Sequence, residues 1–280
     1  MDFLLTYNKK KTKSNLGKTV SRFSKCIKID SNFELNFFCN YKNQPYDFFY
    51  TDNEDFLLIN GLVYSFENKN INNENDETGE IFYFFKKYNF EETLKKIDGD
   101  FSLIYFSKKR KKLFFSRDIF GVFPLYYCKR INSISISSKP SLIFNNGLCS
   151  NLVSKEYIYR YAGLHYRMLD NNPEKSPYVD ISQLPSSSLI IYDIGNDQIL
   201  RKKYWKLEEI DLNLSESEDE LSEIYKEILR ESVRKRVSNK KKKIFSISGG
   251  LDSSSILCLA SDILQKKVNS YSVTYKDDEY

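Results

Sequence analysis

The most informative stretch of this sequence reads Ser246-Ile247-Ser248-Gly249-Gly250-Leu251-Asp252-Ser253-Ser254. An apolar run that predicts a strand, 243–247, precedes it, and an apolar run that predicts a helix, 254–260, follows it. A turn with two glycines between a strand and a helix lets backbone N–H groups approach a phosphate closely. The stretch therefore predicts a phosphate-binding loop between a strand and a helix.

The polar side chains of this loop suit the same ligand. The hydroxyls of Ser248 and Ser253 can donate to phosphate oxygens, and Asp252 can hold a Mg²⁺ that bridges those oxygens. No Gly-Lys-Ser/Thr follows the glycines, so the loop is not of the Walker type. It resembles the SGGxDS pyrophosphate-binding loop of enzymes that cleave ATP between its α and β phosphates. The plainer alternative is a surface Gly-Gly turn with polar neighbours.

The composition indicates a globular protein. The 280 residues suffice for one large domain or two ordinary ones, and 41% of them are hydrophobic, which is enough for a packed core. The formal net charge of +5 is weak evidence for a polyanionic partner. The lysine-rich stretches 9–13 and 240–243 therefore favour solvated loops over nucleic-acid contacts.

The cysteine and histidine content argues against a metal or disulfide framework. The five cysteines are scattered without a CxxC spacing, and His165 is the single histidine. The first residues do not have the pattern of a signal peptide, and no apolar run approaches membrane-spanning length. We expect a soluble cytoplasmic protein without nucleic-acid or membrane partners.

Up to about residue 205 the pattern is mostly that of strands. The dipeptide Asn60-Gly61 lies between apolar runs and predicts a hairpin turn. The basic segment 108–112 predicts the turn of a second hairpin, and a third is expected around 195–197. Strands at 125–127 and 134–137 are expected to continue the meander, helices are expected at 80–88 and 154–161, and the polar stretch 67–76 predicts a loop.

The pattern changes near Tyr204-Trp205. Ser217 and Glu220 form a capping-box signature, and apolar residues at helical spacing then predict an amphipathic helix over 217–238. The phosphate-loop unit follows, and 268–275 predicts one more strand. Alternating helices and strands start a parallel α/β domain. Two strands cannot bury both faces of such a sheet, so we expect this domain to be truncated.

The two halves together resemble the asparagine synthetase family. Five motifs occur in the family's order: Leu58-Ile59-Asn60-Gly61-Leu62-Val63-Tyr64, Asp98-Gly99-Asp100-Phe101-Ser102-Leu103, Arg117-Asp118 through Gly121 to Pro124-Leu125-Tyr126-Tyr127, Leu184-Pro185 with Lys203-Tyr204-Trp205, and Ser248–Ser254. The resemblance implies an α+β sandwich of the N-terminal-nucleophile-hydrolase type over 1–205, a glutamine amidotransferase-like domain. It also implies the beginning of an α/β parallel-sheet domain, similar to adenine nucleotide α-hydrolases, over 213–280.

Several departures from the family pattern indicate a degenerate amidotransferase domain. The family's nucleophile is an N-terminal cysteine, whereas this chain starts Met1-Asp2-Phe3. The family's glutamate after Asn-Gly is Leu62 here, no arginine precedes Gln44-Pro45 between residues 33 and 41, and the aspartate that receives the glutamine amine is replaced near 78–80.

Of the amidotransferase site, only the oxyanion donors Asn60 and Gly61 are retained. An oxyanion hole without a nucleophile does not hydrolyse glutamine at a useful rate. We therefore predict that Asn60 and Gly61 persist as a hairpin turn, and that Arg117 and Asp118 are structural hairpin residues rather than catalysts.

The resemblance implies an ATP-dependent, amide-forming ligase. A carboxylate substrate, a small acid or a peptide, is adenylated with release of pyrophosphate, and an amine or ammonia then displaces AMP. The residues implied in binding ATP are Ser248, Gly249, Gly250, Leu251, Asp252, Ser253 and Ser254, with backbone near Val273 lining the adenine pocket and Asp252 binding Mg²⁺. Without glutamine, the amine is free ammonia or belongs to the substrate, as in β-lactam synthetases and lasso-peptide cyclases.

Three alternatives stay open at this point. The family's later acidic motif has no counterpart here, so the chain could need a separate C-terminal synthetase subunit. A tRNA thiolase or lysidine synthetase also uses this loop, usually without the preceding domain. A non-catalytic remnant that acts as a binding subunit would also fit the missing cysteine.

Overall fold

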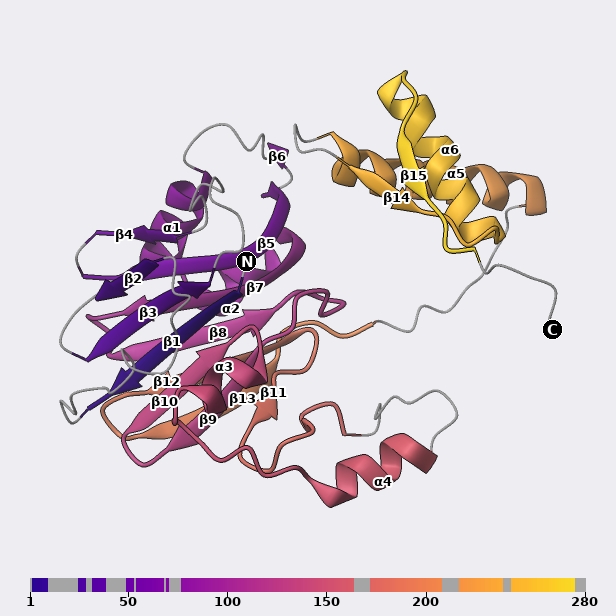
Figure 1. Cartoon of the computed structure of the whole chain (residues 1–280). Coiled ribbons are helices and arrows are strands. Elements are labelled where there is room, and N and C mark those ends of the chain that lie inside the picture. The colour runs from indigo at the N-terminus through magenta and orange to yellow at the C-terminus, as the bar shows by residue number, and fades with distance from the viewer. Residues whose placement is uncertain are drawn as a thin grey trace. The chain divides into compact units, whose positions relative to one another are not determined.

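A computed structural model describes residues 2–9, 25–28, 32–38, 49–52, 54–67, 69–70, 77–163, 172–207, 217–238 and 243–274. The chain divides into two compact units (Figure 1). The first comprises residues 1–71 and 76–207, and the second comprises 72–75 and 208–280. Each unit has a hydrophobic core of its own.

The first unit is built on two sheets whose described strands pair antiparallel. One sheet has six strands in the order β11-β9-β10-β1-β3-β2, and the other has seven, β13-β12-β8-β7-β5-β4 with β6 on β5. The strands are β1 (Asp2–Asn8), β2 (Lys25–Lys28), β3 (Phe33–Phe38), β4 (Phe49–Thr51), β5 (Phe56–Phe66), β6 (Lys69–Asn70), β7 (Ile97–Ser107), β8 (Lys112–Arg117), β9 (Tyr126–Arg130), β10 (Ser133–Ser137), β11 (Ser182–Gln183), β12 (Ser188–Asp193) and β13 (Gln198–Lys203).

The two sheets stack face to face over a buried core. Phe3, Leu5 and Tyr7 of β1 pack in one cluster with residues of β5, β7, β8 and β12. Because side chains alternate along a strand, Leu4 faces the opposite side. There it packs with Ile143 of α3 (Pro140–Asn145).

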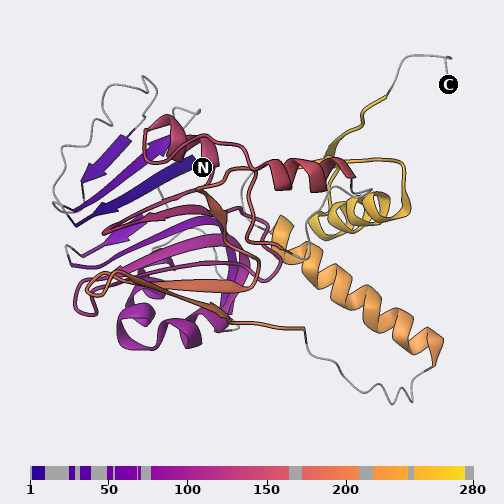
Figure 2. The same cartoon turned by 90° about the horizontal axis from the view of Figure 1, so that it is seen from below.

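Helices cover the outer face of each sheet. The helices α1 (Glu77–Lys87) and α2 (Phe90–Lys95) bury Phe82, Phe85 and Phe90 against the seven-stranded sheet. Figure 2 shows these helices outside one sheet and α3 outside the other, which gives four layers. The predicted α+β sandwich is therefore confirmed. The fourth helix, α4 (Lys155–Gly163), has no buried residue.

Two of the predicted hairpins are confirmed and one is wrong. Strands β7 and β8 pair around the basic turn, and β12 pairs with β13. Asn60 and Gly61, in contrast, lie inside β5 and pair with Ser102 and Phe101 of β7. Glycine occurs inside this strand because β5 and β7 approach each other closely. A Cβ on Gly61 would lie 2.1 Å from the carbonyl oxygen of Asp100.

The expected continuation of the meander is also wrong. Strand β8 belongs to the seven-stranded sheet, whereas β9 and β10 form a hairpin in the six-stranded sheet. The segment between β8 and β9 therefore carries the chain from one sheet to the other. The local sequence pattern does not indicate this change, because sheet membership depends on pairing between strands that are distant in the sequence.

An ionic cluster joins the two sheets at one end. The carboxylate of Asp197, in the β12–β13 turn, accepts hydrogen bonds from Tyr192 Oη at 2.7 Å and from the Asn132 N–H at 2.9 Å. Lys129 Nζ of β9 lies 2.6 Å from the same carboxylate. Partial burial raises the pKa of Asp197, but these partners outweigh it and lower the pKa to about 2.

The second unit begins with the helix α5 (Glu218–Val237). Its capping box is confirmed, because the Glu220 N–H donates to Ser217 Oγ at 3.4 Å and the Ser217 N–H donates to Glu220 Oε2 at 2.7 Å. The strand β14 (Ile244–Ser246), the helix α6 (Leu251–Leu264) and the strand β15 (Asn269–Tyr271) follow. The two strands pair in parallel, as predicted.

The second unit has a small described core. Val233, Val237 and Ala260 are its buried apolar residues, and Arg230 of α5 pairs with Asp262 of α6 at 2.6 Å. Among the helices that the structure describes, none combines the length and apolar character that a membrane span requires.

Gly61→Ala should destabilise the first unit by more than about 3 kcal/mol, because its Cβ would overlap the backbone of β7. Gly147→Ala is the matched control, since Gly147 also has a positive φ of 70° but no atom within 4 Å of an added Cβ. Only backbone strain of about 1 kcal/mol is expected there. Urea unfolding curves measure both changes, and equal losses would contradict the close approach.

Asp197→Asn should lower the free energy of unfolding by about 1–2 kcal/mol at pH 7, because charge-assisted hydrogen bonds are lost. The folded-state pKa of Asp197 lies below the ordinary value of 3.8 for an aspartate. Its carboxylate therefore stabilises the fold above about pH 4, and this contribution is lost as the pH falls through about 2.

The difference between wild type and Asp197→Asn should accordingly shrink over that interval in urea titrations. Glu156→Gln, at an exposed helical ion pair, is the control and should change little at any pH. If the difference in the free energy of unfolding stayed constant down to pH 2, the charge of the Asp197 carboxylate would not stabilise the contact between the two sheets.

Candidate functional site

The phosphate-loop sequence lies where it was predicted, between β14 and α6. The ladder between the two strands extends one residue further, because the Ile247 N–H donates to the Tyr271 carbonyl at 2.9 Å. The loop therefore leaves the carboxyl end of a parallel strand and enters a helix at once. Ligands of open parallel α/β sheets bind at this end of the strands.

The helix starts earlier than the sequence predicted. It begins at Leu251 rather than Ser254, so Asp252 and Ser253 lie in its first turn. Gly250 is the N-cap residue and supplies no side-chain cap. The N–H groups of the first turn and the positive end of the helix dipole are the features that bind a phosphate.

The two glycines have different roles. Gly249 has a φ of +85°, which favours glycine, and no atom of the described residues lies within 4 Å of an added Cβ. Gly250 has a φ of −78°, which any residue adopts, and an added Cβ would lie 3.4 Å from Ser248 Oγ. The conformation alone thus requires glycine only at position 249, and the open space beside it is where a ligand can approach the backbone.

The loop serines bond to each other in this structure. Ser248 Oγ and Ser253 Oγ lie 3.1 Å apart, and the Gly250 N–H donates to Ser248 Oγ at 3.3 Å. The hydroxyls of Ser253 and Ser254 both donate to the Gly250 carbonyl, at 3.1 and 3.0 Å. These hydroxyls converge on one point of the loop, and rotation of Ser248 or Ser253 would turn an O–H toward a phosphate oxygen.

The remaining predicted residues are less defined. Asp252 is exposed in the first turn of α6. Among the described residues, no group of three potential metal-ligating side chains occurs. A Mg²⁺ ion held by Asp252 would therefore draw other ligands from phosphate oxygens and water, which fits a nucleotide-bound ion. Val273 lies beyond the end of β15 and is 75% exposed.

The second candidate site is the position of Asn60 and Gly61 in β5. Asn60 is buried and pairs in register with Ser102, which in turn pairs with Arg117. The hydroxyl of Ser102 is buried and has no hydrogen-bond partner among the described residues. Nearby in register, Tyr64 Oη donates to Asp100 Oδ2 at 2.5 Å.

The two residues that the sequence analysis named as departures from the amidotransferase pattern, Asp2 and Leu62, carry no thiol. Asp2 stands at the first position of β1, where its carboxylate lies 2.6 Å from Lys139 Nζ and accepts from Ser138 Oγ at 3.3 Å. Leu62, the residue after Gly61, is apolar. The Asp2 carboxylate is therefore held in an ion pair, and Leu62 offers no polar contact for an amide.

Asp118 and Arg117 are placed as structural residues, as the sequence predicted, but they lie at the connection between the two sheets rather than in a hairpin. The Asp118 carboxylate accepts backbone N–H bonds from Phe101 at 3.1 Å, Phe120 and Val122 at 2.9 Å, and Gly121 at 2.7 Å. Its side chain is 1% exposed. The oxygens are therefore committed to the backbone of the segment that links the two sheets.

Arg117 donates only to carbonyl oxygens in its described hydrogen bonds. Nε donates to Phe123 at 2.8 Å, Nη1 donates to Leu184 at 2.6 Å, and Nη2 donates to Gly121. Burial lowers the pKa of Arg117. Tyr204 Oη donates to the Arg117 carbonyl at 2.8 Å, a contact that joins two sequence motifs 87 residues apart and that the sequence alone did not predict.

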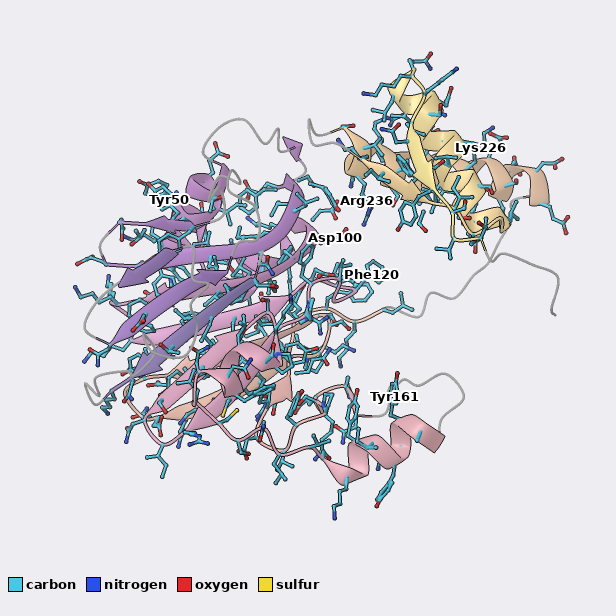
Figure 3. The ribbon with its side chains drawn as sticks, viewed as in Figure 1. Tyr50, Asp100, Phe120, Tyr161, Lys226 and Arg236 are labelled. Atoms are coloured by element: carbon cyan, nitrogen blue, oxygen red, sulfur yellow. The ribbon has the colours of Figure 1, made fainter. Side chains whose placement is uncertain are left out.

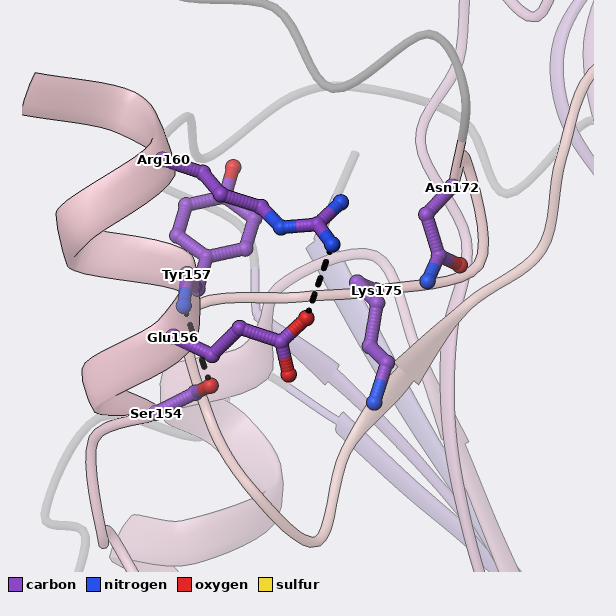
Figure 4. A pocket seen from close by; sticks show the side chains of 6 residues that line it. All are labelled: Ser154, Glu156, Tyr157, Arg160, Asn172 and Lys175. Carbon is purple, nitrogen blue, oxygen red and sulfur yellow. Dashed lines mark hydrogen bonds and ion pairs between the residues drawn. The ribbon is translucent and has the colours of Figure 1, made fainter. Parts of the chain in front are cut away.

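A shallow pocket beside α4 is a weaker candidate (Figure 4). Its lining residues are Ser154, Glu156, Tyr157, Arg160, Asn172 and Lys175. Arg160 is paired with Glu156 at 3.2 Å, and Ser154 Oγ accepts the Tyr157 N–H at 3.2 Å. These contacts are those of an ordinary helix start, and they define no ligand.

Comparisons with known proteins match both units. The family model of the glutamine amidotransferase domain matches residues 39–205, which is more than half of the chain. The asparagine synthase family model matches residues 225–280. The two matches lie in the order in which the motifs occur.

Curated relatives of the chain are named asparagine synthetases. The chain is 29% identical over 236 residues to putative asparagine synthetase [glutamine-hydrolyzing] 1 of Methanocaldococcus jannaschii, covering 81% of this chain and 40% of that protein. It is 25% identical over 171 residues to asparagine synthetase [glutamine-hydrolyzing] 2 of Bacillus subtilis, covering 59% and 23%. The chain thus spans less than half the length of these relatives.

Among solved structures, the chain aligns with glutamine phosphoribosylpyrophosphate amidotransferase from B. subtilis in complex with ADP and GMP. The superposition has a TM-score of 0.38 at 9% sequence identity and covers 86% of this chain and 51% of that one.

Proposed function

This chain belongs to the asparagine synthetase family, and we propose that its loop binds ATP for an amide-forming ligase reaction that does not use glutamine hydrolysed by its own first unit. The family relationship supports an amidotransferase or ligase lineage. The observation that carries the proposal is the open loop at Gly249, which leads directly into the uncapped start of α6.

The residues of the loop would bind and orient the triphosphate. The N–H groups of the first turn of α6 and the hydroxyls of Ser248, Ser253 and Ser254 face the same region and suit the oxygens of a leaving pyrophosphate. Asp252 would hold Mg²⁺, which neutralises charge on those oxygens. In the proposed reaction a substrate carboxylate attacks the α-phosphate, pyrophosphate leaves, and an amine then displaces AMP from the acyl group.

The amine would not come from glutamine at the first unit. Asp2 forms an ion pair with Lys139 where the family places its thiol nucleophile, and Leu62 replaces the family's glutamate. Gly61 persists because the tight pairing of β5 with β7 leaves no room for a side chain there, and Asn60 is the buried residue before it. Free ammonia or an amine of the substrate itself would then attack the acyl carbon.

Titration calorimetry of the full chain with ATP should show binding that depends on Mg²⁺. Ser253→Ala and Asp252→Asn should each weaken it about tenfold or more, because one charge-assisted contact is worth about 1.5–3 kcal/mol. Gly249→Ala should weaken it also, because the added Cβ strains the backbone at φ +85° and occupies the approach to the loop.

Ser255→Ala is the matched control, since Ser255 lies one residue beyond the proposed contacts on the same helix. It should leave the affinity unchanged. A folded chain that binds no ATP in Mg²⁺, or variants that all bind like wild type, would overturn the assignment of the loop.

Incubation with glutamine should release glutamate no faster than a buffer blank, because no nucleophile stands at the first position of β1. Asp2→Ala serves as the comparison and should give the same background. A wild-type rate above both backgrounds would refute the loss of glutaminase activity and leave the ATP proposal untouched.

A further inference from the structure

Two cysteines that are far apart in the sequence meet in one buried cluster. Cys128 of β9 is 4% exposed and Cys149, after α3, is 8% exposed. Both belong to the cluster that Leu4, Ile143 and Ile181 complete between the six-stranded sheet and α3. Both are free thiols.

A chain of polar contacts around the cluster supports this placement. Arg130 lies two residues after Cys128 and so on the same face of β9. Its guanidinium is 3.9 Å from Asp180 Oδ2, and that oxygen accepts Ser150 Oγ at 2.7 Å and the Ser150 N–H at 3.3 Å. Ser150 directly follows Cys149, so the contacts hold the backbone at Cys149 beside the strand that carries Cys128.

The two thiols are close enough to affect each other's ionisation. Burial raises the pKa of both, that of Cys149 to about 12. The thiols also perturb one another directly, and Arg130 counteracts the rise at Cys128. The positive charge of Arg130 beside Cys128 favours the thiolate there, and the thiolate is the reactive form of a cysteine.

We propose that Cys128 and Cys149 form an oxidation site, in which a hydroperoxide converts the pair of thiols into an intramolecular disulfide. The Cys128 thiolate attacks one oxygen of hydrogen peroxide, the O–O bond breaks, and water leaves after protonation, so that Cys128 becomes a sulfenic acid. The Cys149 thiol then attacks the Cys128 sulfur. The S–O bond breaks, a second water leaves, and the two sulfurs have together lost two electrons to the peroxide.

The disulfide would add a covalent link beside the six-stranded sheet. It would close a loop that contains β10 and α3, tying β9 to the segment after α3. Cross-linking restricts the unfolded chain, so the oxidised protein should unfold at a higher temperature than the reduced one.

The test exposes the full chain to hydrogen peroxide, blocks remaining thiols under denaturing conditions and maps peptides by mass spectrometry. We expect a linked peptide pair containing Cys128 and Cys149, about 2 Da lighter than the two thiol peptides together. Dithiothreitol should separate the pair, and thermal unfolding should show the stabilised oxidised form.

Four variants sharpen the test. Cys128→Ser or Cys149→Ser should abolish the linked pair, whereas Cys258→Ser, which removes an exposed thiol of the other unit, should leave it unchanged. Arg130→Gln should slow formation of the pair without preventing it. Arg130 is half-exposed, so this change should be tolerated by the fold.

Mapping of the wild-type protein decides the matter even if a cysteine variant fails to fold. If Cys128 and Cys149 both remain open to alkylation after treatment that oxidises Cys258, the proposal is wrong. It is also wrong if peroxide links either of them to a different cysteine.

Discussion

The first unit depends on the carboxylate of Asp118. Strand β8 ends in one sheet and β9 begins in the other, so the chain must turn sharply between two stacked layers. Several backbone N–H groups are left without sheet partners in that turn, and a buried N–H without a partner is costly. The two oxygens of Asp118 accept three of them, from residues 120–122, and also accept the N–H of Phe101 in β7.

Arg117 supplies the positive charge beside the Asp118 carboxylate. A buried carboxylate is costly unless a cation or several donors accompany it, and the neighbouring guanidinium supplies the compensating charge. The same guanidinium binds carbonyls of the turn and of Leu184, and Tyr204 binds the Arg117 backbone. Distant segments of the motif set thus meet at one point, which explains the density of special residues between 117 and 127.

Local features were predictable from the sequence, whereas the assignment of strands to sheets was not. The capping box of α5, the strand–loop–helix unit and two hairpins are set by residues close in the chain. Sheet membership depends on contacts between distant strands. Strands β5 and β7 are buried on both faces because helices cover the sandwich, so their apolar runs carry no alternation that marks a face.

The error at Asn60-Gly61 has the same origin. Asn-Gly between apolar runs is a local hairpin signal, but glycine also occurs where two backbones approach closely. Gly61 and Gly99 are of this second kind, since added Cβ atoms would lie 2.1 and 2.4 Å from carbonyl oxygens of the facing strand. Only the partner strand distinguishes the two uses of glycine, and the partner lies about forty residues away.

The two candidate sites differ in how closely they are tied to the core. Asn60 and Gly61 stand in a central strand, and the surrounding core would hold them in place whether or not a nucleophile were present. The fold is stabilised by the Asp118 and Arg117 contacts and by aromatic packing, none of which involves Asp2 or Leu62. The chemistry of the first unit can therefore be lost without loss of its structure. The loop between β14 and α6 has the opposite character, because Ser248 is exposed and Ser253 and Ser254 are only half-buried. Ser248 and Ser253 bond to each other, and Ser253 and Ser254 bond to the Gly250 carbonyl. The residues that we propose to bind ATP are therefore the same residues that shape the loop.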